Sequence, residues 1–189
     1  MPRKATKKTG TKKGKKGTKG AKKSARRSGD CKIPAASIRK LVKSELEGKN
    51  VSKEPLAMLQ NLAYDICRNV ADEAVRVRKE QGTKGKAQKM RISAENVEEG
   101  ARDFCKDTSE SPGYIKVAPV KKCVVAHLGK DDYMLEKETG AVFVTVVENM
   151  ILALARVAAL VAGKKKTLKQ EHFDAAMEIA GLLSGYTFP

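Results

Sequence analysis

The chain has 189 residues, of which 41% are hydrophobic and 4% aromatic, so it is long enough for one or two small domains with largely helical cores. Its formal net charge of +17 is uneven, because residues 1–32 hold 14 Lys and Arg against one Asp while the rest is nearly balanced. The segment 1–30 contains no apolar run, so we expect neither a signal peptide nor a membrane anchor there.

The N-terminal segment 1–32 is rich in Lys, Gly, Thr and Ala. Such a segment cannot bury enough apolar surface to offset the entropy lost on folding, so we expect a disordered tail. Its charge suits a polyanion, because each phosphate that it neutralises releases condensed counterions. Nucleic acid is therefore the expected partner. An anionic membrane is the alternative, but the tail has no hydrophobic anchor and no lipidation motif.

The first half of the folded part predicts a short helix, a long helix and a second short helix, connected by loops. Pro34 opens the first helix and Gly48 stops it. Ser52 is expected to cap the long helix, and Ser93 is expected to cap the third, from Ala94 to Phe104. The apolar stripe of the long helix, with steps of three or four positions, is Leu56, Leu59, Ala63, Ile66, Val70, Ala74 and Val77.

The second half predicts the same order of helices. Pro119 opens a short helix that Gly129 ends. Thr139 is expected to cap a long helix that ends at Gly163, and a final helix follows from Gln170 to Leu182.

The long helix of the second half is apolar nearly all round, which predicts that no face is left for water. Its helical spacing continues to Val161. It is almost long enough to cross a membrane, but Thr145, Glu148, Asn149 and Arg156 lie inside the run, and ionised groups there are costly in lipid. We therefore predict a core helix that needs partners on several sides.

Spacing along the chain reveals two tandem copies of one unit. Four positions recur at a constant offset of 76 in the numbering: Ile92, Glu95, Val97 and Ala101 as Leu168, Glu171, Phe173 and Met177. The expected caps Ser52 and Thr139 differ by 87 in the numbering, and the longer loop 81–89 absorbs the difference of 11. Each unit can bury its apolar stripe only when the other unit crosses it. Each aliphatic side chain buried in this way stabilises the fold by about 1.5–3 kcal/mol.

The sequence therefore predicts an all-α fold of two units, residues 33–106 and 119–189, joined by a linker at residues 107–118. The core between the two long helices is predicted to hold Leu56, Leu59, Ile66, Val70, Val144, Val147, Ile151 and Leu154.

Both units resemble core histones. The first contains VSKEPLAMLQNLAYDICRNVADEAVRV and then RISAENVEEGA, and it resembles histone 2B in its central and third helices. The second contains PVKKCVVAHLGKDDYMLEKETGAVFVTVVENM and then GKKKTLKQEHF, and it resembles histone 2A. In this order, over about residues 34 to 180, they resemble the fused 2B–2A histone doublets of giant viruses of the marseillevirus group, in a compact version.

This resemblance implies two tandem histone folds that close on each other as an intramolecular handshake pair. It also implies assembly with a histone 4–3-like doublet and a second copy of this chain, to wrap duplex DNA in nucleosome-like particles. The implied location is the virion and the viral factory or host nucleus. Contacts are expected to phosphates and DNA shape rather than to base sequence.

The DNA-binding residues that the resemblance implies are Arg26, Arg27, Lys32, Lys89, Arg91, Lys121, Lys122, Lys137, Lys164, Lys165, Lys166 and Lys169. Arg91 is the best candidate for an arginine that enters the minor groove. For each lysine, the alternative is an ordinary solvated surface charge.

The chain also departs from the resemblance. The long helix of histone 2A carries acids that form a docking patch, and here Glu148 is retained while later positions fall on Ala153 and Arg156. We expect this patch to be weakened or abolished. The linker replaces the C-terminal helix usual in histone 2B, and the tail of histone 2A is nearly absent, so we expect a particle less stable than a cellular nucleosome.

Other functions have weaker support in the sequence. No nucleophile–base arrangement, Walker-type loop or metal-ligand spacing is visible, so we expect no enzyme, no metal, no cofactor and no small-molecule substrate. The four cysteines lack CxxC spacing and are expected to be reduced thiols, mostly packed. The main alternative is a histone-fold architectural or transcription subunit that binds DNA without forming particles. An RNA-packaging protein fits the tail but not the paired long helices.

Overall fold

The computed structural model describes residues 32–82, 89–105 and 110–184. Residues 1–31 of the predicted tail 1–32, most of the loop 81–89, residues 106–109 around the start of the predicted linker and the segment 185–189 lie outside this part of the chain. In chain order the elements are α1 (Ala35–Glu45), β1 (Asn50–Val51), α2 (Glu54–Glu80), β2 (Met90–Ile92), α3 (Ala94–Ala101), α4 (Val117–Leu128), β3 (Tyr133–Leu135), α5 (Thr139–Ala162), β4 (Thr167–Leu168) and α6 (Gln170–Ser184).

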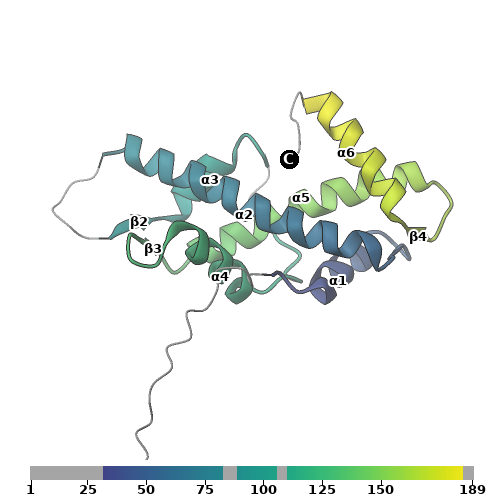
Figure 1. Cartoon of the computed structure of the whole chain (residues 1–189), viewed down its shortest axis with the longest axis horizontal. Coiled ribbons are helices and arrows are strands. Elements are labelled where there is room, and N and C mark those ends of the chain that lie inside the picture. Colours follow the sequence, from purple (N-terminus) through teal and green to yellow (C-terminus); the bar gives the residue numbers. More distant parts are fainter. Residues whose placement is uncertain (1–31, 83–88, 106–109, 185–189) are drawn as a thin grey trace, which may run out of the picture.

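The short–long–short order of helices occurs twice, as predicted. Figure 1 shows α2 and α5 along the length of the molecule, with α1 and α4 on one side of them and α3 and α6 on the other. The two long helices pack against each other, and each also contacts short helices of the other unit. The two units therefore form one body rather than two separate domains.

Two short parallel strand pairs join the units, and neither was predicted: three of the four strands lie in predicted loops, and β2 was expected only as a short segment before the third helix. In one pair Val51 of β1 lies beside Leu168 of β4, and in the other Ile92 of β2 lies beside Leu135 of β3. Each pair takes one strand from each half, and the pairs lie at opposite ends of the molecule (Figure 1). Such short segments cannot show a strand period, so no local pattern could have predicted them.

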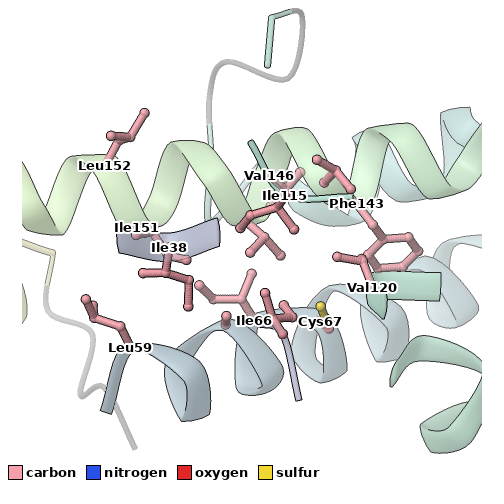
Figure 2. Close-up of a cluster of buried hydrophobic side chains, with 14 of the residues drawn as sticks. Ile38, Leu59, Ile66, Cys67, Ile115, Val120, Phe143, Val146, Ile151 and Leu152 are labelled. Carbon is pink, nitrogen blue, oxygen red and sulfur yellow. The ribbon is translucent and has the colours of Figure 1, made fainter. Parts of the chain in front are cut away.

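The core lies where α2 and α5 cross. Figure 2 shows Leu59 and Ile66 of α2 facing Ile151 and Val146 of α5. The eight residues predicted for this core are all buried, with at most 7% of each exposed. The short helices contribute Ile38 and Val120, which close the core on the side of α1 and α4. Burial of these side chains stabilises the folded state by about 25 cal/mol per Å² of apolar surface removed from water.

The predicted caps of the two long helices are wrong. Residue Lys53, not Ser52, precedes α2, and it makes no side-chain cap. Thr139 is the first residue of α5, and its hydroxyl donates to the carbonyl of Ile92 at 3.0 Å. Thr139 therefore connects the two halves instead of capping its own helix.

The predicted cap of α3 is confirmed, and α6 uses a similar device. The Ser93 hydroxyl accepts from the Asn96 backbone N–H, and the Asn96 side chain accepts from the Ser93 N–H at 3.1 Å. At the corresponding positions of α6, Nδ1 of His172 accepts from the N–H of Lys169 at 3.0 Å. Each bond satisfies a donor that lacks a partner within the helix.

Three other boundaries differ from the prediction. Helix α4 begins at Val117, two positions before Pro119, because a proline is tolerated in the first turn, where the N–H has no helical acceptor. Helix α3 ends at Ala101 and continues as a turn to Phe104, while α6 extends to Ser184. The left-handed Gly163, with φ of 56°, ends α5 as predicted.

Helix α5 exposes one strip, contrary to the prediction that no face is left for water. Leu160 is 81% exposed and Val161 is 41% exposed, and Ala153 and Arg156 lie on the surface nearby in the sequence. By length and composition α5 could cross a membrane, but 56% of the most apolar 18-residue stretch of this helix is buried inside the protein. The structure thus places α5 as the central core helix.

Gly100 marks the closest approach of α3 to α2. A Cβ atom at this position would lie 2.7 Å from the backbone nitrogen of Ala74 and 3.0 Å from the backbone carbon of Glu73.

We predict that Gly100→Ala lowers the free energy of unfolding by about 1–3 kcal/mol, because backbone atoms must move. Urea unfolding of the full chain measures this change. Glu98→Ala, on the exposed face of α3, is the control and should change stability by less than about 0.5 kcal/mol. An equal or higher stability of Gly100→Ala would contradict the close packing.

Candidate nucleic-acid interface

The β2–β3 end of the molecule gathers several of the predicted basic residues. Arg91 is exposed between two less exposed neighbours, because side chains alternate along β2. The ammonium group of Lys89, in the first half of the chain, donates to the backbone carbonyl of Lys130, in the second half, at 3.0 Å. Lys137 is exposed two positions after β3. The strand pairing thus brings Lys89, Arg91 and Lys137, from both halves, to one end.

The β1–β4 end holds the predicted lysine cluster. Lys164, Lys165, Lys166 and Lys169 are all exposed around β4. Of these, Lys165 has a carboxylate partner, with its Nζ 3.7 Å from Oε1 of Glu171. Because this pair is exposed at the surface, it leaves most of the positive charge of the cluster available.

Sequence reasoning missed Lys49 at this end. Its ammonium group donates to the carbonyls of Gly163 and Lys165, at 2.5 and 2.7 Å. These carbonyls follow the C-terminus of α5, where a cation is favourable. Lys49 therefore fixes the lysine loop of the second half from the first half, and no sequence signal connects residues 114 positions apart.

The short helices expose basic residues on one face. Lys121 and Lys122 of α4 are exposed beside the buried Val120, Cys123 and Val124.

The same pattern stands earlier in the chain, in α1. There Ile38, Leu41 and Val42 are buried, and Arg39 and Lys40 are exposed in the positions that correspond to the α4 lysines. Arg39 and Lys40 were not predicted, although extending the repeat to this helix would have found them.

Lys53 and Lys137 are another pair of corresponding residues, and each stands shortly before a long helix. Lys137 stands two positions after the buried Leu135, and Lys53 stands two positions after the buried Val51. Lys53 is exposed and was also not predicted. The backbone agrees with this correspondence, because the N–H group directly after each buried position donates across the halves, to Leu168 and Ile92.

Several of the basic residues therefore occur in pairs related by the internal repeat, which are Arg39 with Lys121, Lys40 with Lys122 and Lys53 with Lys137. Two groups lie at the strand-pair ends, and the α1 and α4 groups lie between them on the same side of the long helices (Figure 1). Lys32 is exposed where the described part begins, before α1. The predicted Arg26 and Arg27 lie outside the described residues. Arg91 has no basic counterpart, since the repeat places Thr167 at the corresponding position.

Three exposed arginines of α2 and its neighbour α3, which are Arg68, Arg76 and Arg102, pair with acids on or next to their own helix. Arg76 of α2 contacts Glu73 at 2.6 Å and Glu80 at 2.8 Å. Its hydrogen bond to Glu73, followed by that to Glu80, raises the pKa of the guanidinium. Arg102 contacts Glu99 in the same way at 2.9 Å. This charge balance distinguishes α2 and α3 from the basic side of the molecule.

The structure corrects the expectation that Glu148 is retained for a docking patch. Glu148 is fully buried, and its carboxylate accepts from the N–H groups of Gly113 and Ile115 and from the hydroxyl of Ser111. The linker covers it, so it is not available to a docking protein.

The described residues contain no group of three or more His, Cys, Asp or Glu side chains placed to hold a metal ion. Cys67 and Cys123 are buried thiols, and Cys105 is half-buried. The fourth cysteine, Cys31, lies outside the described part.

Comparison with known structures identifies the fold. The histone of Methanopyrus kandleri superposes with a TM-score of 0.62 at 15% sequence identity, over 77% of this chain and 93% of that one. The fold is a tandem pair of histone folds. The match spans both units, because 77% of 189 residues is more than either unit contains. A protein of Thermus thermophilus superposes with a TM-score of 0.57 at 18% identity, over 80% and 98% of the two chains. No protein-family model matches the chain, and no curated protein matches it in sequence.

The Thr139 hydroxyl holds the β2–β3 end of this histone-fold pair in place. We predict that Thr139→Val lowers the free energy of unfolding by about 1–1.5 kcal/mol, because the hydrogen bond to the Ile92 carbonyl is lost while that carbonyl keeps the N–H of Glu136 as a donor. The control is Thr145→Val on the same helix, whose hydroxyl donates to Ala141 within α5 at 3.2 Å. It should cost no more than about 0.5 kcal/mol, because that bond joins no separate elements. Equal losses in urea unfolding would contradict a role of Thr139 in joining the halves.

Proposed function

We propose that this protein packages duplex DNA. The observation that supports the proposal is the repeat-related set of exposed cations on one side of a histone-fold pair. Arg39 and Lys40 of α1 correspond to Lys121 and Lys122 of α4, and basic groups stand at both strand-pair ends.

A duplex fits this arrangement by physical chemistry. Phosphates recur along a duplex at regular spacing, so spaced basic groups can bind several of them at once. Lysines and backbone groups bind phosphates without reading bases, while an arginine such as Arg91 suits a narrow minor groove. The net charge of +13 in residues 1–32 adds a second, less specific contribution to affinity. Binding should therefore depend on DNA shape and salt rather than on sequence.

The finer form of the proposal is a viral histone doublet. The order of a 2B-like unit before a 2A-like unit supports it, together with the paired histone folds. In this form the chain joins a histone 4–3-like doublet and a second copy of itself in nucleosome-like particles. It would work in the virion and in the viral factory or host nucleus, as a structural protein without catalytic activity, cofactor or membrane association.

We predict that replacing Arg39 and Lys40 together with Gln weakens binding to duplex DNA. The slope of log K against log salt should become less steep by about 1.8, since each phosphate contact contributes about 0.9. Fluorescence anisotropy with one labelled duplex at several salt concentrations measures this slope.

The matched control replaces Arg68 and Arg76 of α2 with Gln, which removes the same charge. These arginines pair with Asp65 and Glu73 on their own helix, so the slope should stay unchanged. If both double variants change the slope equally, binding follows net charge alone and the proposed interface is wrong.

We also predict particle formation on duplex DNA when a histone 4–3-like partner is present. Micrococcal nuclease should then leave a protected fragment of discrete length, and without the partner it should not. The particle should release its DNA at lower salt than a cellular nucleosome, because residues 107–118 replace a C-terminal helix. A continuous smear of fragments with the partner present would favour an architectural or transcription subunit instead.

A further inference from the structure

The linker between the two units is fastened to α5 by one buried carboxylate. The Glu148 side chain is 0% exposed and accepts three hydrogen bonds, all from residues 111–115. The donors are the Ser111 hydroxyl, the Gly113 N–H at 2.9 Å and the Ile115 N–H. We call Glu148 with Ser111, Gly113 and Ile115 the linker clamp.

The linker clamp depends on local backbone geometry and on charge. Gly113 has a φ of 76°, which other residues rarely adopt, and its N–H donates to both the Ser111 hydroxyl and Glu148. A buried carboxylate is costly unless hydrogen bonds satisfy it, so the loss of one donor weakens the clamp and a second negative charge would oppose it.

Ser111 is the one component of the clamp whose side chain a modifying enzyme can approach from the surface. Residues 110–113 are exposed and belong to no helix or strand. Ser111 also precedes Pro112, and of the six prolines in the sequence only this one follows a serine or threonine. An exposed irregular segment with one Ser-Pro pair is the kind of substrate that a proline-directed protein kinase takes.

We propose that Ser111 is a phosphorylation site and that its phosphorylation opens the linker clamp. The Ser111 oxygen attacks the γ-phosphorus of a nucleoside triphosphate, and the bond from that phosphorus to the bridging oxygen breaks. The nucleoside diphosphate leaves, and the hydroxyl proton passes to the base of the kinase. No oxidant or reductant takes part.

The product cannot rebuild the clamp. Phosphoserine has lost the hydroxyl donor and carries a charge of about −1.5 to −2 at neutral pH, next to the Glu148 carboxylate. The charged side chains that line the hollow beside Ser111 are Glu45, Glu110 and Arg156, so acids outnumber bases there. Repulsion therefore favours release of the linker, which leads directly into α4 at Val117.

The first experiment treats the folded full-length chain with a purified proline-directed serine/threonine kinase and ATP, and maps the phosphate by mass spectrometry. The proposal expects modification at Ser111, and loss of that signal in Ser111→Ala. Hydrogen exchange of the Gly113 and Ile115 amides should become about tenfold faster in the modified chain, which corresponds to about 1.4 kcal/mol. Failure of the kinase to modify Ser111, or unchanged exchange after modification, would overturn the proposal.

A second comparison separates charge from shape without a kinase. Ser111→Asp and Ser111→Asn have nearly the same size, and only the first brings a negative charge towards Glu148. The proposal expects exchange at Gly113 to be several times faster in Ser111→Asp than in Ser111→Asn. With Glu148→Gln added to both, that difference should disappear. Equal exchange in the first pair, or a difference that persists after Glu148→Gln, would refute repulsion by Glu148. These outcomes are independent of DNA binding.

Discussion

The crossing of α2 and α5 is the interaction on which the rest of the structure depends. Neither long helix can bury its apolar side chains within its own unit, because two short helices cover only part of its surface. Each helix therefore supplies the missing half of the other's core, with Leu59 and Ile66 of α2 facing Ile151 and Val146 of α5. The short helices, the strand pairs and the linker take positions that this crossing makes available.

The same crossing determines where the basic residues stand. Each end of the molecule combines a strand that precedes one long helix with a strand that follows the other. Lys49 from the first half fixes the lysine loop of the second, and Lys89 reaches the carbonyl of Lys130 in the other half. A basic end is thus a product of both halves, and neither half could form it alone.

Local patterns in the sequence predicted most of the fold, because helical spacing and glycine stops are local signals. The eight core positions and the cap at Ser93 are examples. Contacts between distant residues were not predictable in this way. The Thr139 hydroxyl bonds to Ile92, 47 positions away, and the linker covers Glu148, which looked like a surface acid. Of the interface, the repeat could have supplied Arg39 and Lys40, whereas Lys49 required the strand pairing.

The covalent connection between the units has a kinetic and thermodynamic consequence. Two separate histone-fold chains associate in a second-order reaction, and dilution separates them. Here the connection between α3 and α4 is so short that each unit meets the other at an effective concentration of about millimolar or higher. The pair therefore assembles in a first-order step with fixed one-to-one composition, and its stability is the same at any protein concentration.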